Sequence, residues 1–373
     1  MGVIGCGVRG RGVGAYAASA GGVEIRGVAD VYRPHRSLAA EAFGEEAESV
    51  SDYRRVLDCK DVDAVIVATP DHLHAPVTLA AIDAGKDVYL EKPVTHRLEE
   101  GSALIRAAER SGRVIATGTQ QRSWHHFMEA KRIIDRGILG RVTFVRCFWN
   151  QDYSALRSAP APRIDPEQLD WDGWLGPARS QPFDATRFRF WRFFWDFGGG
   201  SVTDLMTHWI DVVQWFLDCR RAAGVRATGA TYVHDWLEAP DTVVATIAYP
   251  EELMVVYEGN MTFGLLGCGI EFRGDRAMMV IDRTGYAVYE EGTKPLESVT
   301  LPEPVHRFAR SDDTSRAERV DGTGTMDNVR NWLDCVRTRR TPNADLRSGV
   351  ESAATAHLVN QSIRERRTVS LPS

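Results

Sequence analysis

Short apolar runs alternate with stretches of helical character through the first third of the chain. Five of these runs are predicted strands: GVIG (2–5), VEIRGVAD (23–30), DAVIVATP (63–70), KDVYLE (86–91) and RVIATGT (113–119). Helices are predicted over residues 77–84 and 97–111. Strands that alternate with helices through short loops are typical of an α/β domain built on a doubly wound parallel sheet. We expect such a domain over residues 1–119.

The pattern changes from residue 120 onward. A helix is predicted over 124–136 and a strand over 141–149, and many strand-like runs follow between residues 223 and 300, separated by Gly, Pro and Asp. This spacing favours an α+β domain over 120–373, with a large, mostly antiparallel sheet and helices on one face. A sheet with one uncovered face is often buried by self-association. Two domains also suit the length, because 373 residues are too many for one ordinary core.

Two polar segments interrupt this pattern. Residues 157–187 are rich in Pro, Arg and Asp, and we expect a long ordered excursion there. Residues 303–324 are mostly polar and are expected to form a loop. Helices over 325–337 and 345–364, separated by Pro342, are predicted near the end of the chain.

Composition and charge narrow the range of partners. The 45 basic and 51 acidic residues give a net charge of −6, which argues against nucleic acid or an anionic membrane as the main partner. The six cysteines are scattered without a C-x-x-C pair, so we expect reduced thiols and no disulfide framework or metal site. No apolar run approaches the roughly 18 residues of a membrane span. No signal peptide is visible, which favours a cytoplasmic protein, although a strand that starts at Met1 is abrupt enough for an export signal to have been trimmed.

The first predicted strand runs into a glycine-rich turn, Gly5-Cys-Gly7-Val8-Arg9-Gly10, and then into a segment that can be helical. Glycines at this spacing suit a tight turn, close backbone approach to a pyrophosphate and close helix packing. The N-terminus of the helix then offers N–H groups and a positive dipole to the phosphates. The turn therefore predicts a dinucleotide-binding (Rossmann) domain in which these residues contact the cofactor.

Asp30 ends the second predicted strand, twenty residues after Gly10. An acid at this position accepts hydrogen bonds from the adenosine ribose hydroxyls, which favours NAD over NADP. The alternative is a simple turn residue at a strand end. Arg33 and Arg36 follow closely and could hold a 2′-phosphate, so NADP stays the less favoured cofactor.

A lysine follows another predicted strand, in the sequence YLEKPVTH (89–96). Ligands of parallel sheets bind at the carboxyl ends of strands, where Lys92 and Glu91 lie, as do Thr69 and Pro70 of the strand before. We therefore predict that these residues line the cofactor crevice. The alternative for Lys92 is a surface ion pair with Glu91, since most lysines are surface charges.

Two histidines, His72 and His74, follow Pro70 in the sequence TPDHLH (69–74). They are expected beside the nicotinamide, and His74 is predicted to contact the cofactor. For both, loop shaping or helix capping is a more common role than catalysis.

The sequence GGGSVTDLMTHWID (198–211) is the most informative segment of the second domain. A helix predicted to run to about residue 217 places Asp204 and His208 four residues apart on one face. A carboxylate that fixes the tautomer of an imidazole is suited to acid–base chemistry. Two alternatives stay open, because Ser201-Val-Thr-Asp204 is also a capping-box pattern and His208 also suits a satisfied histidine of the core.

The combination of GCGVRG, Asp30, TPDHLH, EKP and GGG-x-x-x-D-x-x-x-H-x-x-D resembles the glucose–fructose oxidoreductase / inositol dehydrogenase (Gfo/Idh/MocA) family, over nearly the whole chain. EKP at the end of the predicted strand KDVYLE (86–91) is the specific part of this pattern. The resemblance implies that Lys92 lies near the nicotinamide and the reacting hydroxyl, and that Asp204 and His208 are the catalytic pair. Asp211 would support them or touch substrate. The family also implies final helices that pack back on the first domain, and a homodimer or homotetramer.

An aromatic cluster precedes the glycines: Phe188, Phe190, Trp191, Phe193, Phe194, Trp195 and Phe197. Rings stack on the apolar faces of sugars, but a place in the core or at a subunit interface is the expectation for most of them. Arginines 187, 189 and 192 alternate with the rings, and one or two of them are expected to reach substrate. The predicted substrate contacts are Lys92, Arg122, Trp191, Asp204 and His208.

These features predict an NAD(P)-dependent oxidoreductase that transfers a hydride between nicotinamide and a ring hydroxyl of a sugar, glycoside or inositol-like polyol, without a metal. His208, oriented by Asp204, is predicted to take the hydroxyl proton while Lys92 stabilises the oxygen. A variant has Lys92 as the base. An enzyme that cleaves or epimerises a glycoside through transient redox chemistry at a sugar carbon would use the same residues. A sugar-sensing regulator ranks last, because such relatives tend to lose the lysine or the histidine.

Overall fold

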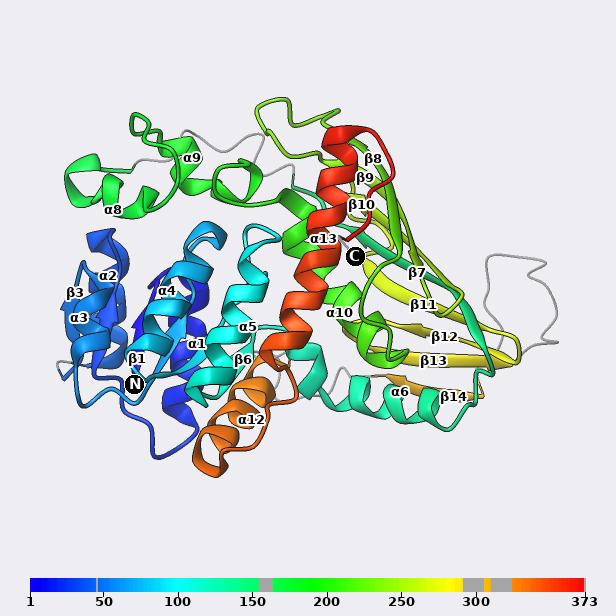
Figure 1. Cartoon of the computed structure of the whole chain (residues 1–373), viewed down its shortest axis with the longest axis horizontal. Helices are drawn as coiled ribbons and strands as arrows, with labels where there is room; N and C mark the ends of the chain where they lie inside the picture. Colours follow the sequence, from blue (N-terminus) through cyan, green and yellow to red (C-terminus); the bar gives the residue numbers. More distant parts are fainter. Residues whose placement is uncertain (45, 154–163, 291–304, 310–323, 372–373) are drawn as a thin grey trace. The chain divides into compact units, whose positions relative to one another are not determined.

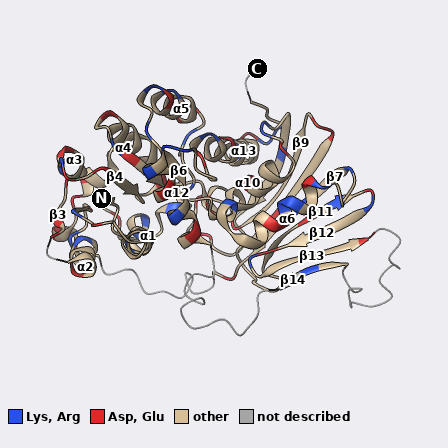
Figure 2. Cartoon of the chain, turned by 90° about the horizontal axis from the view of Figure 1, so that it is seen from below, with Lys and Arg blue, Asp and Glu red and all other residues tan. Residues whose placement is uncertain are grey.

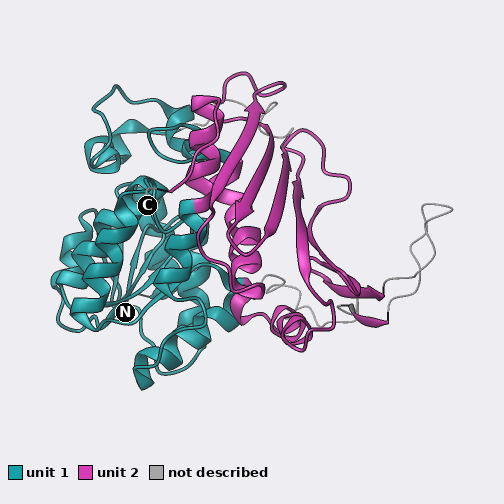
Figure 3. Cartoon of the chain, turned by 45° about the vertical axis from the view of Figure 1, so that its right-hand side comes forward, with its two compact units in different colours: residues 1–120, 159–200, 325–354 teal, residues 121–158, 201–324, 355–373 magenta. Residues whose placement is uncertain are grey.

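The computed structural model describes residues 1–44, 46–153, 164–290, 305–309 and 324–371 (Figure 1). The chain forms two compact units (Figure 3). The first unit comprises residues 1–120, 159–200 and 325–354, and the second comprises 121–158, 201–324 and 355–373. The predicted division into domains at residues 119 and 120 stays a prediction.

The first unit contains a six-stranded sheet whose strands are all parallel. Its order is β3 (Glu48–Val50), β2 (Gly27–Ala29), β1 (Gly2–Ile4), β4 (Ala64–Val67), β5 (Asp87–Leu90) and β6 (Ile115–Thr117). The predicted doubly wound parallel sheet is confirmed. The order reverses between β1 and β4, and ligands of such sheets bind at this point, outside the carboxyl ends of the strands.

Helices cover both faces of this sheet. One face packs against α1 (Val8–Ser19), α2 (Arg33–Phe43) and α12 (Thr325–Thr338). The other packs against α3 (Tyr53–Asp58), α4 (Asp71–Asp83), α5 (Glu100–Ser111) and the beginning of α13 (Leu346–Glu365). Successive strand residues point to opposite cores, as Ile66 and Val67 do. Both faces are therefore apolar, which explains why the strands are continuous hydrophobic runs.

Helix α4 begins earlier than predicted. It starts at Asp71 instead of residue 77 and contains Pro76. Proline is usually found in the first turn of a helix, because it has no N–H to donate. Here Pro76 lies further in, at the sixth residue of the helix.

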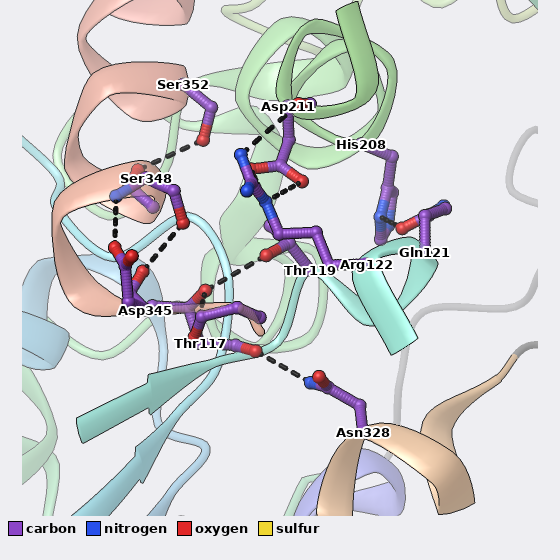
Figure 4. Close-up of polar contacts among 12 residues, drawn as sticks. Thr117, Thr119, Gln121, Arg122, His208, Asp211, Asn328, Asp345, Ser348 and Ser352 are labelled. Carbon is purple, nitrogen blue, oxygen red and sulfur yellow. Dashed lines mark hydrogen bonds and ion pairs between the residues drawn. The ribbon is translucent and has the colours of Figure 1, made fainter. Parts of the chain in front are cut away.

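Helix α12 is anchored to the first sheet although it lies more than 200 residues away in sequence. The side chain of Asn328 donates from Nδ2 to the carbonyl oxygen of Thr117 at 2.8 Å and to the hydroxyl of Tyr89 at 3.1 Å, and Figure 4 shows the first of these bonds. Trp332 of the same helix is fully buried and packs against Tyr89. The sheet therefore depends on this distant helix for part of its core.

The predicted excursion over 157–187 also belongs largely to the first unit. From residue 164 onward it consists of short helices: η2 (Pro166–Gln168), α8 (Trp171–Leu175), α9 (Ala185–Arg189) and η3 (Trp191–Phe193). The backbone of Asp170 donates to the carbonyl of Val31 at 3.1 Å, next to the end of β2. Residues 157–163 lie outside the described residues.

The second unit contains an eight-stranded sheet that is mostly antiparallel, as predicted. Among the described strands of this second sheet, only β7 and β10 pair in parallel. The order is β14 (His306–Ala309), β13 (Gly285–Glu290), β12 (Ala277–Ile281), β11 (Cys268–Gly274), β7 (Val142–Asn150), β10 (Leu253–Asn260), β9 (Thr242–Tyr249) and β8 (Gly224–Ala230). One face packs against α6 (His125–Asp135), α10 (Thr207–Phe216) and the end of α13.

Strand β14 corrects the prediction of a loop over residues 303–324. Residues 306–309 pair antiparallel with β13, although polar residues surround them in the sequence. An edge strand is stabilised by its backbone bonds to one neighbour, so it needs little apolar character. Residues 303–304 and 310–323 lie outside the described residues.

The other face of this sheet carries charged and half-exposed apolar side chains. Arg146 contacts Glu258 at 2.8 Å and Glu271 at 2.9 Å, and basic and acidic residues are interspersed on β7 and β11 (Figure 2). Val244 and Met254 keep 45% and 42% of their surface exposed. Burial of this face in a homodimer or homotetramer stays a prediction.

The six cysteines are all free thiols in this structure, and four of them are buried. None of the helices in the described part of the chain combines the length and the hydropathy that a bilayer crossing needs.

Replacement of Trp332 by Ala tests whether α12 is integral to the first unit. A fully buried Trp leaves a large cavity, so we expect a loss of about 3–5 kcal/mol in the free energy of unfolding. Urea denaturation followed by circular dichroism measures it. Leu38→Ala is the control, because Leu38 is 48% exposed and its truncation should change stability by about 0.5 kcal/mol or less. Equal effects of the two changes would show that α12 adds little to this core.

Candidate functional site

The three glycines of the first turn differ in the space that surrounds each of them. Gly5 has φ +87°, and a Cβ there would lie 2.5 Å from the carbonyl oxygen of Ala68. A Cβ on Gly10 would overlap the carbonyl oxygen of Gly5. By contrast, no described atom lies within 4 Å of the Cβ position of Gly7. The protein itself therefore requires Gly5 and Gly10, whereas Gly7 leaves open the space that a pyrophosphate needs.

The N-terminus of α1 is suited to an anion. Its N-cap residue is Gly7, and no side chain among the described residues caps it. The first turn contains no acidic residue, and Val8 is 85% exposed. The N–H groups and the positive end of the helix dipole are thus left for a negatively charged ligand, so this turn fits the predicted dinucleotide.

The carboxylate of Asp30 is fixed at the end of β2 by two backbone groups. Its Oδ2 accepts from the N–H of Cys6 at 2.7 Å, and its Oδ1 accepts from the N–H of Tyr32 at 2.9 Å. Arg36 donates from Nη1 to the carbonyl of Asp30 at 2.7 Å, and Arg33 donates from Nε to Gln168 at 3.4 Å. Both arginines therefore already have partners near the place where a 2′-phosphate would bind.

A hollow of about 350 Å³ lies beside Asp30. Its lining residues come from the turn after β2, from the first turns of α2, from Ser51 and from the excursion: Val31, Arg33, Arg36, Ser51, Glu167, Gln168, Leu169 and Asp170. Basic and acidic side chains both line it. The hollow is therefore not a purely cationic phosphate site.

The residue before Lys92 is a buried acid with defined partners. Glu91 is 4% exposed, and its Oε1 accepts from Nε of Arg9 at 2.7 Å. Its Oε2 accepts from the backbone N–H of Lys92 at 3.3 Å, and a Cβ on Gly118 would lie only 2.6 Å from this oxygen. The alternative of an exposed ion pair between Lys92 and Glu91 is wrong, because this carboxylate is inside the protein. Arg9, predicted as a cofactor contact, holds the EKP segment in place.

His74 links the EKP segment to the loop that follows β4. Its Nδ1 lies 2.6 Å from the carbonyl oxygen of Pro93, and its Nε2 lies 2.9 Å from that of Thr69. Burial lowers the pKa of His74 to about 4, although its carbonyl partners act in the opposite direction. A neutral ring donates to only one of these two carbonyls. His74 therefore shapes the loops around Lys92, and the Lys92–Pro93 peptide bond is cis.

His72 is held in an aromatic environment. Its Nε2 donates to the carbonyl of Trp174 at 3.0 Å, and its ring packs against Trp174 and Phe197. Burial lowers the pKa of His72 to about 4, so the ring is neutral at pH 7. This histidine joins α4 to the excursion and is a structural residue.

The second unit contains His208 at the start of α10. Its side chain is buried, and its ring stacks on Trp149 with centroids 5.9 Å apart and planes at 24°. Its Nδ1 lies 3.3 Å from Oε1 of Gln121 (Figure 4). The ring is thus fixed by a polar and an apolar neighbour.

The segment before α10 departs from the predicted α-helix. Residues Val202–Met206, which include Asp204, form a π-helical turn. Such turns are rare and occur often at functional sites. Ser201 makes no side-chain capping bond, so the capping-box alternative is wrong for this serine.

Arg122 and Asp211 form a buried ion pair. Nε of Arg122 lies 2.9 and 2.8 Å from the two carboxylate oxygens of Asp211, which is fully buried (Figure 4). The guanidinium also lies 5.6 Å from the ring centroid of Trp215. Arg122, predicted to touch substrate, therefore anchors its own segment to α10. Asp211 is its support, one of the two roles expected for it.

Most of the predicted aromatic cluster is interior. Four of the seven rings are buried: Phe188, Phe193, Phe194 and Phe197. Trp191 is only partly buried, and the guanidinium of Arg192 lies 4.3 Å from its ring centroid. Arg187 donates to Asp196 at 2.7 Å. Among these residues, Trp191 stays the predicted substrate contact.

The predicted site residues fall into two groups. The first unit brings together the glycine turn, Asp30, Thr69, His74, Glu91 and Lys92 at the carboxyl ends of its strands. The second unit holds Arg122, Asp204, His208 and Asp211 on η1 (Gln120–Ser123) and on the helical segment 202–216. Sequence reasoning missed Gln121 and Gly118, since glutamine and glycine give no chemical signal unless their neighbours are known.

These features define the class of protein. A Rossmann unit with an uncapped helix N-terminus, an anchored acid after β2 and a lysine after β5 is an NAD(P)-binding domain of the oxidoreductase type. A family model described as "Oxidoreductase family, NAD-binding Rossmann fold" matches residues 1–119, and the model of that family's C-terminal alpha/beta domain matches residues 168–371. The chain belongs to the Gfo/Idh/MocA oxidoreductase family.

Individual relatives are more distant. Over 176 residues, the chain is 32% identical to levoglucosan dehydrogenase of Pseudarthrobacter phenanthrenivorans, covering 46% of this chain and 43% of that protein. Over 125 residues it is 31% identical to inositol 2-dehydrogenase of Salmonella paratyphi B, covering 33% and 37%. The match thus spans about two-fifths of the length of these curated relatives. A solved levoglucosan dehydrogenase, in complex with NADH and levoglucosan, has a TM-score of 0.75 at 21% identity, with 100% and 99% of the two chains covered, which shows the shared fold.

The glycine turn gives a paired prediction. Gly7→Ala should keep the stability of the protein and weaken the binding of NAD at least tenfold, because the new methyl group occupies the open space. Gly10→Ala should lower the melting temperature, because its methyl group overlaps Gly5. Calorimetric titration with NAD and thermal denaturation separate the two effects. Unchanged NAD affinity in a folded Gly7→Ala protein would show that the ligand does not approach this glycine.

The lowered pKa of His72 predicts that the folded protein loses stability in mild acid. Its pKa is lower in the folded protein than in the unfolded chain, so the unfolded state takes up the proton first. Stability is therefore complete above pH 6.5 and falls as the pH drops towards 4, by about 3 kcal/mol in total for this group. Urea unfolding at pH 7 and pH 5 should show a smaller loss for His72→Gln, which cannot be protonated. An identical loss in both proteins would mean that His72 does not contribute.

Proposed function

We propose that this protein is an NAD-dependent dehydrogenase that oxidises a ring hydroxyl of a sugar or cyclic polyol. The observation that carries the proposal is the anchored EKP segment. It holds Lys92 at the carboxyl end of β5, next to a glycine turn with room for a pyrophosphate. The levoglucosan and inositol dehydrogenases among the relatives support the substrate class.

NAD is the proposed cofactor, with NADP less favoured. The fixed carboxylate of Asp30 suits a ribose hydroxyl, and it would repel a 2′-phosphate. Arg33 and Arg36 have partners already, and Glu167 and Asp170 add negative charge to the nearby hollow. When bound, the nicotinamide supplies the acceptor for the hydride.

Lys92 and His208 are proposed to act on the same hydroxyl. The ammonium group of Lys92 would donate a hydrogen bond to the oxygen and stabilise its developing negative charge. His208 would accept the hydroxyl proton as the hydride leaves, with Asp204 nearby in the sequence as the acid of the pair. The reverse assignment, with Lys92 as the base, uses the same residues.

Arg122 receives a different role from the one predicted. Its Nε is bound to Asp211, so we propose that it holds η1 in position instead of binding sugar hydroxyls through that atom. Trp191 is kept as a proposed sugar contact, because its ring is partly exposed.

The first experiment is a dehydrogenase assay. The absorbance of reduced nicotinamide is followed while the purified protein meets NAD or NADP and a panel of inositols, aldoses, anhydrosugars and simple glycosides. We expect turnover with one sugar class and a preference for NAD. Lys92→Met and His208→Ala should each lower kcat by at least about a hundredfold, the size of a general acid–base or charge-stabilising contribution.

Three outcomes would contradict this proposal. Full turnover in both variants would exclude the assigned chemistry. NAD binding without accumulation of NADH, but with cleavage of a glycoside, would instead support transient redox chemistry at a sugar carbon. NAD binding without any conversion would favour a sensing role.

A further inference from the structure

The imidazole of His208 faces the amide of Gln121 within the second unit. Nδ1 of His208 and Oε1 of Gln121 are 3.3 Å apart, and Gln121 is fully buried (Figure 4). The other amide atom of Gln121, Nε2, has no hydrogen-bond partner among the described residues. A buried amide with one unsatisfied end costs stability, so its retention asks for a role beyond packing.

An ion pair one residue away keeps this contact in register. Gln121 and Arg122 are neighbours on η1, and His208 and Asp211 are three residues apart on α10, so they share a helix face. The bond from Arg122 Nε to both oxygens of Asp211 therefore fixes η1 against the turn of α10 that carries His208. The two charges neutralise each other, and the neighbouring amide of Gln121 contacts the histidine.

The ring plane of His208 is also fixed. It stacks on Trp149, whose Nε1 donates to Gln151 at 3.0 Å. On this tryptophan lies the guanidinium of Arg283, 4.8 Å from the ring centroid. Rotation of the imidazole would break both the stack and the amide contact.

We propose that Gln121 is a positioning residue that sets the tautomer of His208. The amide oxygen of Gln121 accepts a hydrogen bond from the Nδ1–H group of His208. The Nε2 atom of His208 then carries the lone pair that would receive the hydroxyl proton. The inference rests on the proposed function of His208. An amide partner orients the ring as a carboxylate would, without a full negative charge to hold the proton afterwards.

The tautomer can be measured without any substrate. Protein labelled with ¹⁵N-histidine is studied by NMR at a pH where the ring is neutral, and His208→Gln identifies the signal of His208. We expect the Nδ1–H form in the natural protein and a change towards the Nε2–H form in Gln121→Leu. Retention of the Nδ1–H form in Gln121→Leu, or an Nε2–H form in the natural protein, would overturn the proposal.

Kinetics test whether the tautomer matters. Gln121→Leu should lower kcat about tenfold or more, with KM for substrate changed less than threefold. Gln121→Glu is isosteric and should restore the tautomer, while its added charge moves the acidic limb of the kcat/KM profile up by about one pH unit. Charged groups also occur on the elements that pack near the ring: Asp204 on the same helical segment, the Arg122–Asp211 pair and Arg283 on Trp149.

Gln120→Leu is the matched control. Gln120 is the adjacent glutamine, is 3% exposed and also has an unsatisfied amide oxygen among the described residues, whereas the amide that faces Nδ1 of His208 belongs to Gln121. It should leave the NMR signal of His208 and its pH profile unchanged. A tautomer change in Gln121→Leu without loss of kcat would overturn the positioning role while leaving the proposed function intact, since Lys92→Met and His208→Ala test that function separately.

Discussion

The arrangement of the turns at the carboxyl ends of the first unit's strands depends on one buried carboxylate, that of Glu91. An acid inside a protein is costly unless its charge is paired and its oxygens are hydrogen-bonded. Arg9, from the glycine turn after β1, supplies the charge, and Gly118, after β6, leaves the space. The turns that follow three different strands must therefore be compatible with one another. The lysine next to Glu91 is held in place by this requirement.

The second unit solves a similar problem in another way. Its full charges, Arg122 and Asp211, neutralise each other one residue from Gln121 and one helical turn from His208. The imidazole itself meets an uncharged amide and an indole ring. Strong electrostatic anchoring thus comes from the ion pair, while the amide and the indole ring hold the plane of the imidazole.

The sequence was sufficient to predict those features that depend on local periodicity or on residues close together in the chain. Five of the six parallel strands, Asp30 at the end of β2 and Lys92 at the end of β5 follow from apolar runs and from the rule that strand ends meet at one edge, whereas the short edge strand β3 was not predicted. Strand β14 was missed because its stability comes from pairing with β13, not from its own residues. The partner of His208 was also missed, since Gln121 lies 87 residues away in sequence. Contacts of this kind appear only once the chain is folded.

The division of the chain among the two units has an evolutionary consequence. Six consecutive segments alternate between the units, so the polypeptide passes from one to the other five times. A single crossover between two genes therefore cannot exchange one complete unit for another. New specificity in such a protein must arise by substitutions within segments, or by replacement of one segment such as residues 159–200. That architecture favours gradual divergence on a fixed scaffold over the shuffling of whole modules.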